Sequence, residues 1–389
     1  MKKIAILGST GSIGNSTLNV IEANPGVFSI TLLSAESNVD SIFNQIKKFK
    51  PKYVYLNDGS SSKELNSRLS SENLKTSLLN EKDYLDTIAS NDVEIVVAGV
   101  VGIAGLKSIH KAVSAGKRIL LANKEAYVVA GELLNALAEL NESTIFPIDS
   151  EHSAIHQCLS GKKDTSGGVK KIILTGSGGP FLNRNLKEFI HITPEEAVMH
   201  PVWKMGKKIS VDSATMMNKG LEVIEAKWLF KIDSEKIGIL VHPEGIVHSL
   251  VEFEDASLLA QMSVPDMKIP IAYGLGFPER IKSNSQRLSL EKIEQLNFCK
   301  PDLKKFPSIG MSRASLDSGG TSPSLLNAAN EEAVRAFLDK KIYFTQITEI
   351  ISFVMDTIPI KAVKELENIF QADTLARKSA LTRIHQLRS

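Results

Sequence analysis

The run Lys-Ile-Ala-Ile-Leu-Gly-Ser-Thr-Gly-Ser-Ile-Gly at residues 3–14 joins a short apolar strand to a glycine-rich turn. Helical periodicity follows it through about Glu22. Glycines at such a bend let the backbone approach a pyrophosphate, which binds the free amides at the helix N-terminus. The spacing Gly-x-x-Gly-x-x-Gly is a weak signal by itself, because such turns are often glycine-rich for steric reasons. Its place between a strand and a helix predicts a dinucleotide-binding site.

Strand and helix patterns alternate from this turn to about residue 148. Short apolar runs predict strands at residues 3–7, 28–34, 53–56, 95–98, 118–121 and 144–148. Helical periodicity fills most of the gaps, as at residues 39–49, 106–115 and 126–139. This alternation is typical of an α/β fold with a doubly wound, Rossmann-like parallel sheet.

The rest of the chain changes character twice. Strand patterns at residues 170–174, 237–241, 247–253 and 258–262 predict a central α+β domain. Helical patterns at residues 326–337, 344–355 and 363–387 predict a C-terminal helical bundle. Residues from about 280 to 310 have no clear period and indicate a linker. We therefore expect a dinucleotide-binding domain (1–148), a catalytic domain (149–280), a linker (281–310) and a helical domain (311–389).

Composition excludes several classes of protein. Of the 389 residues, 43% are hydrophobic and 23% charged, as in ordinary globular proteins. A net charge of +2 without basic runs gives no support for nucleic-acid or membrane binding, and the longest apolar runs are only strand-length. Cys158 and Cys299 show neither metal-ligand spacing nor a disulfide framework. The first strand leaves no room for a signal peptide, so we expect a cytoplasmic protein.

Two carboxylates follow the strand predicted at 144–148. Only Ser150 separates Asp149 from Glu151, and the carboxyl ends of parallel strands line the ligand crevice. We expect both side chains to point into that crevice. The alternative is a helix N-terminus, with Asp149 or Ser150 as the cap and Glu151 favoured by the helix dipole. Lys124 follows another strand and should reach the same crevice.

The run Val-Asp-Ser-Ala-Thr-Met-Met-Asn-Lys-Gly-Leu-Glu at residues 211–222 sets hydroxyls, an amide and an ammonium beside a carboxylate. If it is helical from Asn218 onward, Asn218 and Glu222 share a face. A phosphate could then meet Ser213, Asn218 and Lys219 while Glu222 faces a metal; a capped amphipathic helix is the alternative. Glu222 and the two carboxylates described above would repel one another unless a cation lay among them. Oxygen ligands favour Mg²⁺ or Mn²⁺ over Zn²⁺.

Two loops carry further candidate ligands. The Gly-Ser-Gly-Gly sequence at 176–179 follows a strand and would offer Ser177 and several backbone amides to a phosphate, or form a plain tight turn. Residues 200–208 combine His200, Trp203 and three lysines, which suggests a cationic lid that closes over an anionic ligand. The alternative for Trp203 is an anchor in the core.

Together these motifs resemble the 1-deoxy-D-xylulose 5-phosphate reductoisomerase family, in that family's order. They are Gly-Ser-Thr-Gly-Ser-Ile-Gly (8–14), Leu-Ala-Asn-Lys-Glu (121–125), Asp-Ser-Glu-His (149–152), Thr-Gly-Ser-Gly-Gly-Pro-Phe (175–181), His-Pro-x-Trp-x-Met-Gly (200–206) and the run at 211–222. Pro-Asp-Met at 265–267 and Leu-Asn-Ala-Ala-Asn-Glu at 326–331 extend the resemblance over nearly the whole length. The long run ending at Glu222 is highly specific, whereas the glycine turn alone is not.

The resemblance implies an NADPH-dependent, metal-dependent homodimer that converts 1-deoxy-D-xylulose 5-phosphate to 2-C-methyl-D-erythritol 4-phosphate, on the non-mevalonate route to isoprenoids. The implied reaction is an intramolecular rearrangement followed by hydride reduction. By motif matching, Asp149, Glu151 and Glu222 are the Mg²⁺ or Mn²⁺ ligands, and Lys124 lies beside the reacting hydroxyls. These four are the catalytic candidates; Lys124, Glu151 and Glu222 are also expected to contact substrate, with Ser150, Ser177, His200, Trp203, Ser213, Asn218 and Lys219. The matched NADPH positions are Thr10, Gly11, Ser12, Ile13, Asn38, Asn123, Glu125 and Gly206, and Trp203 and Met205 belong to a mobile flap, with Met205 on the cofactor side.

One departure from the family pattern concerns the cofactor. Some members have Ala-Gly-Lys-Asn after the second strand, whereas this chain has Ala-Glu-Ser-Asn at 35–38. No basic residue follows before Lys47 to neutralise a ribose 2′-phosphate, and Glu36 would repel that phosphate or bind a bare ribose. We expect NADPH to be held by Ser37, Asn38 and backbone amides, with a weaker preference over NADH than is usual.

Two alternative functions remain at this point. A semialdehyde dehydrogenase has a similar glycine turn but needs a cysteine nucleophile, and neither Cys158 nor Cys299 is well placed. A nucleotide-sensing protein without catalysis would have no need of an acidic triad beside the nicotinamide.

Overall fold

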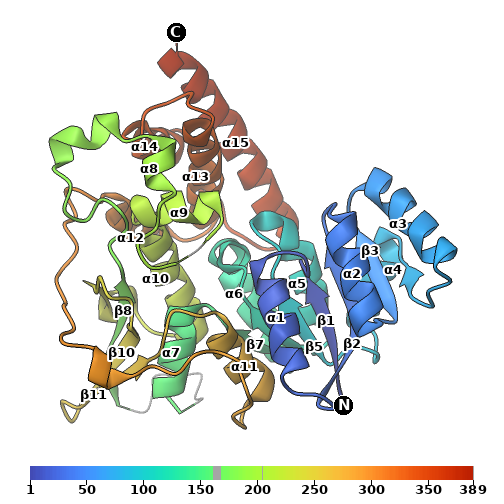
Figure 1. The fold of residues 1–389 in the computed structure, drawn as a ribbon. Coiled ribbons are helices and arrows are strands. Elements are labelled where there is room, and N and C mark those ends of the chain that lie inside the picture. The colour runs from blue at the N-terminus through green and yellow to red at the C-terminus, as the bar shows by residue number, and fades with distance from the viewer. Residues whose placement is uncertain (161–167, 204, 389) are drawn as a thin grey trace. The chain divides into compact units, whose positions relative to one another are not determined.

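The computed structural model describes residues 1–160, 168–203 and 205–388. The chain forms two compact units, each described here by itself (Figure 1). Unit 1 comprises Met1–Ala126, Leu134–Ser153 and Asp266–Gln286, and unit 2 comprises Tyr127–Leu133, Ala154–Pro265 and Arg287–Ser389. The finer division into four parts stays a prediction.

Unit 1 contains the parallel sheet that the alternating patterns predict. Its strands pair in the order β4-β3-β2-β1-β5-β6-β7, all of them parallel. Their bounds are Lys2–Leu7 (β1), Phe28–Ala35 (β2), Tyr53–Leu56 (β3), Ser77–Leu78 (β4), Ile95–Ala98 (β5), Arg118–Leu121 (β6) and Thr144–Pro147 (β7). The order reverses direction on either side of β1, which confirms the doubly wound class.

Helices accompany this sheet: α1 (Ser12–Glu22), α2 (Val39–Phe49), α3 (Gly59–Ser71), α4 (Glu81–Ala89), α5 (Leu106–Ser114), α6 (Lys124–Leu140) and α11 (Lys268–Gly276). Amphipathic helices such as α2 and α5 turn an apolar stripe toward the core. Residues of α6 are divided between the two units. Asparagine side chains start three of these helices, since Asn38, Asn80 and Asn123 accept hydrogen bonds from backbone amides of the first turn.

The helix α11 belongs to unit 1 although the chain reaches it after β8–β11 of unit 2. It packs against α1 and contributes Ile271 and Leu275, both fully buried, to the core of the sheet. At Gly274 an added Cβ would lie 2.9 Å from Ile148 Cγ2, so the helix lies close against the sheet. The Arg118 guanidinium donates to the Gly274 carbonyl at 2.6 Å and the Phe277 carbonyl at 3.0 Å.

Unit 2 is built on a mixed sheet of order β11-β10-β8-β9. Only the β8–β9 pair is parallel. The strands are β8 (Val169–Gly176), β9 (Ile237–Val241), β10 (Val247–Phe253) and β11 (Leu258–Met262). The helices are α7 (Ser150–Cys158, shared with unit 1), α8 (Pro194–Ala197), α9 (Lys207–Ala214), α10 (Met217–Phe230), α12 (Ser308–Ser318), α13 (Ser322–Leu338), α14 (Gln346–Thr357) and α15 (Leu366–Arg388).

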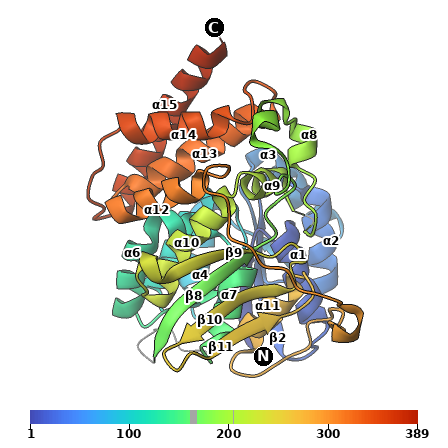
Figure 2. The same ribbon diagram turned by 90° about the vertical axis from the view of Figure 1, so that its left-hand side faces the viewer.

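The C-terminal helices α12 to α15 gather at one end of unit 2 (Figure 2), as the C-terminal periodicity predicts. Short 3₁₀ helices occur at Ile103–Gly105, Leu186–His191, Ser234–Lys236 and Leu290–Lys292. In the described ranges, no helix has both the length and the apolar character required to cross a membrane.

Candidate active site

The turn between β1 and α1 has the tight geometry expected of a dinucleotide site. Gly8 has a φ of +77°, and an added Cβ would lie 2.8 Å from the Gly99 carbonyl oxygen. At Gly14 an added Cβ would lie 2.3 Å from the backbone carbonyl oxygen of Ser9, so only glycine lets α1 start this close to the strand. Ser9 and Gln45 hydrogen-bond each other twice, which fixes the turn. The predicted cofactor residues Thr10, Gly11, Ser12 and Ile13 lie at this helix start.

Other predicted cofactor residues of unit 1 lie at carboxyl ends of neighbouring strands. Ser37 and Asn38 are exposed after β2, and Asn38 caps α2. Asn123 follows β6 and is buried; its amide donates to the Gly102 carbonyl at 2.8 Å, and its oxygen accepts from Ala126 N–H. Glu125 is also buried. Because parallel strands end at one edge of the sheet, unit 1 gathers these residues at the edge that the β1–α1 turn occupies.

The acidic residues after β7 also lie at this edge. Lys124 Nζ lies 2.6 Å from Asp149 Oδ2, and Ser150 donates its N–H to Asp149 Oδ1 and its hydroxyl to Glu151 Oε2. Burial alone would raise the pKa of the Asp149 carboxyl. The positive charge of Lys124, followed by the interaction with His152, lowers this pKa by more than burial raises it. The pKa therefore lies well below its ordinary value, and the carboxylate is ionised.

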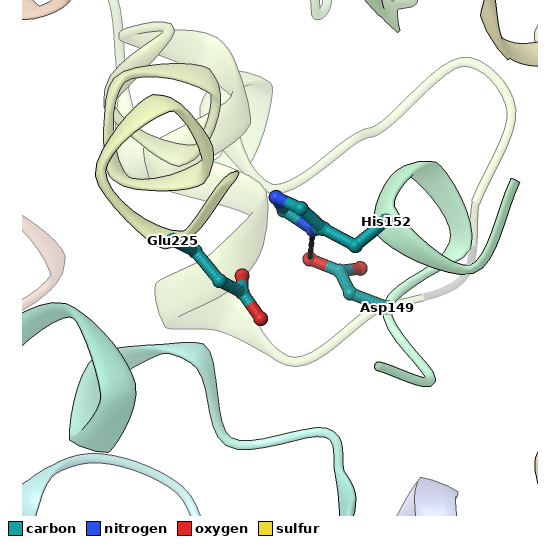
Figure 3. Close-up of side chains that lie close together, drawn as sticks. All are labelled: Asp149, His152 and Glu225. Atoms are coloured by element: carbon teal, nitrogen blue, oxygen red, sulfur yellow. Dashed lines mark ion pairs between the residues drawn. The ribbon is translucent and has the colours of Figure 1, made fainter. Parts of the chain in front are cut away.

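His152 is a neighbour of this cluster that the sequence analysis did not single out. It is fully buried, and its Nδ1 lies 3.7 Å from Asp149 Oδ2 (Figure 3). Figure 3 also draws Glu225, which lies on α10, three residues after Glu222. The spacing of three residues in both Asp149–His152 and Glu222–Glu225 was the available signal, because such residues share a helix face.

The helix α10 carries the predicted phosphate and metal residues of unit 2. It begins at Met217, as the shared face of Asn218 and Glu222 requires. Glu222 is fully buried, and its two oxygens accept from Asn218 Nδ2 and Lys219 Nζ, each at 2.6 Å. These charge-assisted hydrogen bonds compensate a carboxylate that has left water. Asn218, Lys219 and Glu222 therefore form one polar cluster on α10.

In the loop after β8, the hydroxyl of Ser177 is oriented to donate a hydrogen bond. His200 Nδ1 accepts from the backbone N–H groups of Val202 (3.1 Å) and Trp203 (2.8 Å), so the neutral ring carries its proton on Nε2. That nitrogen lies 3.0 Å from Ser177 Oγ, which also accepts from Gly179 N–H. Having accepted two hydrogen bonds, the Ser177 hydroxyl has its own proton to donate to an anion.

Glycines bring this loop close to the other predicted phosphate residues. An added Cβ at Gly176 would lie 2.8 Å from Lys219 Cε, and one at Gly179 would lie 2.7 Å from the Ser213 carbonyl oxygen. Gly179 also has a φ of +68°. Within unit 2, the 176–179 loop therefore lies against Lys219 and Ser213, and its Ser177 contacts His200; the phosphate role of this loop stays a prediction.

The predicted lid lies between His200 and α9. Trp203 is half-buried, with its ring centroid 6.1 Å from that of His248. Met205 is half-buried, and Gly206 is exposed as the residue before α9. Lys204, part of the predicted cationic lid, lies outside the described residues. Lid closure stays a prediction.

Two sets of side chains in the described chain have the composition of a metal site: Asp149 and Glu151 with Glu222, and Asp149 and His152 with Glu225. Carboxylate oxygens alone suit Mg²⁺ or Mn²⁺, whereas an imidazole ligand suits softer ions.

Three family models match the chain in succession. They describe 1-deoxy-D-xylulose 5-phosphate reductoisomerase (residues 4–131), the C-terminal domain of that enzyme (145–230) and the DXP reductoisomerase C-terminal domain (262–379). The reductoisomerase of Nitrosomonas eutropha is 46% identical over 98% of this chain and 93% of its own length. That of Psychromonas ingrahamii is 46% identical over 98% of both chains.

Solved structures give the same result. A DOX-P reductoisomerase crystallised with NADPH, fosmidomycin and magnesium is 42% identical, with a TM-score of 0.96 over the full length of both chains. The reductoisomerase of Zymomonas mobilis, solved in complex with NADPH, is 40% identical, with a TM-score of 0.91 over 98% of this chain and 99% of that one. The chain belongs to the 1-deoxy-D-xylulose 5-phosphate reductoisomerase family.

Proposed function

We propose that this chain rearranges 1-deoxy-D-xylulose 5-phosphate and reduces the resulting aldehyde with NADPH to give 2-C-methyl-D-erythritol 4-phosphate. Family membership over nearly the whole length is the observation that carries this proposal. The overall reaction transfers one hydride from NADPH and takes up one proton. The chain must therefore bind a dinucleotide, hold a phosphorylated sugar and manage protons on its oxygens.

We assign Asp149, Glu151 and Glu222 as the ligands of Mg²⁺ or Mn²⁺. The donor chemistry fits, because all three offer carboxylate oxygens and Asp149 is ionised. The lysine beside each of Asp149 and Glu222 shows that both places already favour positive charge. When bound, the ion would act as a Lewis acid toward the keto and hydroxyl oxygens of the substrate.

Lys124 is the residue that we assign to proton handling. Its Nζ lies 2.6 Å from Asp149 Oδ2, and the side chain is buried. An ammonium in this position stabilises negative charge that develops on a substrate oxygen, both during the rearrangement and when hydride arrives. The Ser150 hydroxyl donates a hydrogen bond to Glu151, and we assign Ser150 to orienting the substrate oxygens.

We assign the substrate phosphate to the group of unit 2 formed by Ser177, His200, Ser213, Asn218 and Lys219. Ser177 donates its hydroxyl and Lys219 supplies charge beside the glycine loop. The phosphate is remote from the bonds that change, so its binding energy can orient the sugar and support closure of Trp203 and Met205 over it. Exclusion of water would then strengthen the charge interactions inside.

A homodimer and a cytoplasmic location complete the proposal. The dimer rests on the family resemblance alone. Cys158 and Cys299 are both free thiols, as is usual in a reducing compartment.

The alternative of a cysteine-dependent semialdehyde dehydrogenase finds no support in Cys158. Burial raises the pKa of the Cys158 thiol to about 11. At neutral pH only about one molecule in ten thousand would carry the nucleophilic thiolate. A purely nucleotide-sensing role is disfavoured in turn by the enzyme family to which the chain belongs.

The first test follows NADPH absorbance in the presence of 1-deoxy-D-xylulose 5-phosphate, with Mg²⁺, with EDTA, and with EDTA followed by excess Mn²⁺. We expect oxidation of NADPH with Mg²⁺, loss of it with EDTA and recovery with Mn²⁺, because the metal polarises the reacting oxygens. Absence of turnover under all conditions would contradict the proposed reaction. Turnover that EDTA leaves unchanged would contradict the metal requirement.

Replacing Glu222 with Gln should lower kcat by about 100-fold or more at saturating metal, because the ligand charge is lost while shape is kept. The thermal unfolding midpoint, followed by circular dichroism, separates this from misfolding. Glu235→Gln, an exposed residue of the same unit, is the matched control and should keep full activity. Near-normal turnover of Glu222→Gln would remove it from the ligand set.

Replacing Lys219 with Gln should raise the KM for 1-deoxy-D-xylulose 5-phosphate by about tenfold or more, because a buried charge facing the phosphate is lost. The KM for NADPH should stay within about twofold, since Lys219 is assigned to the other ligand. Steady-state kinetics with each substrate varied in turn measures both values. Lys236→Ala, exposed in unit 2, serves as the control; an unchanged sugar KM for Lys219→Gln would refute the phosphate assignment.

Alkylation should separate the two cysteines. With iodoacetamide at pH 7.5, we expect the exposed Cys299 to be labelled first and Cys158 slowly, since its thiolate becomes abundant only as the pH approaches about 11. Peptide mass spectrometry against time reads both rates. Cys158→Ser should keep full reductoisomerase activity; a variant devoid of activity but folded would revive the thiol mechanism.

A further inference from the structure

We propose that Glu36 binds the ribose 2′-hydroxyl of NADH and so gives this chain substantial NADH-dependent activity beside that with NADPH. The inference deepens the proposed function and rests on it, because it concerns the reductant of the same reaction. It makes Glu36 the residue that sets the dinucleotide preference.

The position of Glu36 in the fold supports this role. It directly follows β2, the strand beside β1, and lies 22 residues after Gly14, the last glycine of the β1–α1 turn. In doubly wound dinucleotide-binding folds, an acidic residue about 20 residues beyond the glycine turn accepts hydrogen bonds from the adenosine ribose. Glu36 is exposed, so a ribose can reach it.

Neighbouring side chains hold Glu36 in a defined orientation. Its Oε1 accepts from Asn57 Nδ2 at 2.9 Å, and Asn57 Oδ1 accepts from Tyr55 OH at 3.1 Å. The Tyr55 ring stacks on Tyr84, with centroids 4.2 Å apart. Asp58 N–H donates to the Glu36 carbonyl at 2.9 Å, which fixes the backbone. Among the hydrogen bonds of the described chain, none engages Oε2, so this oxygen remains to accept a ribose hydroxyl.

The charges around this position oppose a 2′-phosphate. No Lys or Arg occurs between Lys3 and Lys47. Lys47 lies nine residues beyond Asn38, which is about 14 Å along α2 at 1.5 Å per residue, and it pairs with Glu72. The next strand end adds Asp58, a second carboxylate.

NADPH and NADH are therefore expected to interact differently with Glu36. A 2′-phosphate carries close to two negative charges and would face the Glu36 carboxylate without a basic residue from the 35–38 loop between them. The 2′-hydroxyl of NADH would instead donate to a carboxylate that is already oriented. Ser37 and Asn38 remain as neutral partners for NADPH, so we expect use of both reductants rather than an exchange of one for the other.

The test compares kcat/KM for NADPH and NADH at saturating sugar phosphate and Mg²⁺, in wild type, Glu36→Gln and Glu36→Lys. We expect the wild-type NADPH/NADH ratio to lie within about tenfold of unity. Both variants should raise it by about tenfold or more, equivalent to about 1.4 kcal/mol, through KM with kcat unchanged. Titration calorimetry with NADP⁺ and NAD⁺, without substrate, should show the same shift in the ratio of dissociation constants.

Glu72→Gln is the matched control, because it removes the same charge from unit 1 at the far end of α3. It should leave both ratios unchanged. A wild-type enzyme that prefers NADPH by more than about 100-fold, or variants whose ratios move less than twofold, would overturn the inference while leaving the reductoisomerase assignment intact. Shifted nucleotide affinities without sugar-phosphate turnover would instead overturn the proposed function and leave the role of Glu36 standing.

Discussion

Compensation of two carboxylates, one buried and one largely shielded from water, by adjacent lysines is the constraint on which the rest of the structure depends. Glu222 is fully buried on α10 with Lys219 Nζ at 2.6 Å, and Asp149 has Lys124 Nζ at the same distance. Charges taken out of water destabilise a fold unless such partners are present. In unit 1 the lysine and the carboxylate follow neighbouring strands, whereas in unit 2 both lie on the single helix α10. Asp149 and Glu222 are also two of the three carboxylates that we assign as metal ligands.

Much of the fold could be predicted from local patterns. Strands β3, β5, β6, β9, β10 and β11 have the predicted bounds, because short stretches rich in apolar residues mark them in the sequence. The two-residue strand β4 is too short to show a period. Nothing in the periodicity of α11 indicates which sheet it covers; that follows from non-local contacts such as Ile271 with the core of unit 1.

The candidate site divides in a similar way. The helical register that sets Asn218 and Glu222 on one face was predictable from spacing, and the structure has it. The role of His200 as an acceptor of two backbone N–H groups was not, because it depends on how the loop folds back on itself. The spacing of three residues between Asp149 and His152 could indicate their proximity, but only in combination with the helix that begins at Ser150. Sequence therefore indicates candidate ligands more readily than the residues that orient them.

The late position of α11 has a consequence for biosynthesis. All seven strands of the first sheet have been synthesised when Pro147 leaves the ribosome. The apolar surface that Ile271 and Leu275 cover stays exposed to solvent until about Gly276 has also emerged. By then β8 to β11 have also been made. The first sheet is therefore fully covered only after β8 to β11 of unit 2 have been synthesised, and a product truncated before Lys268 would expose apolar surface to chaperones and proteases.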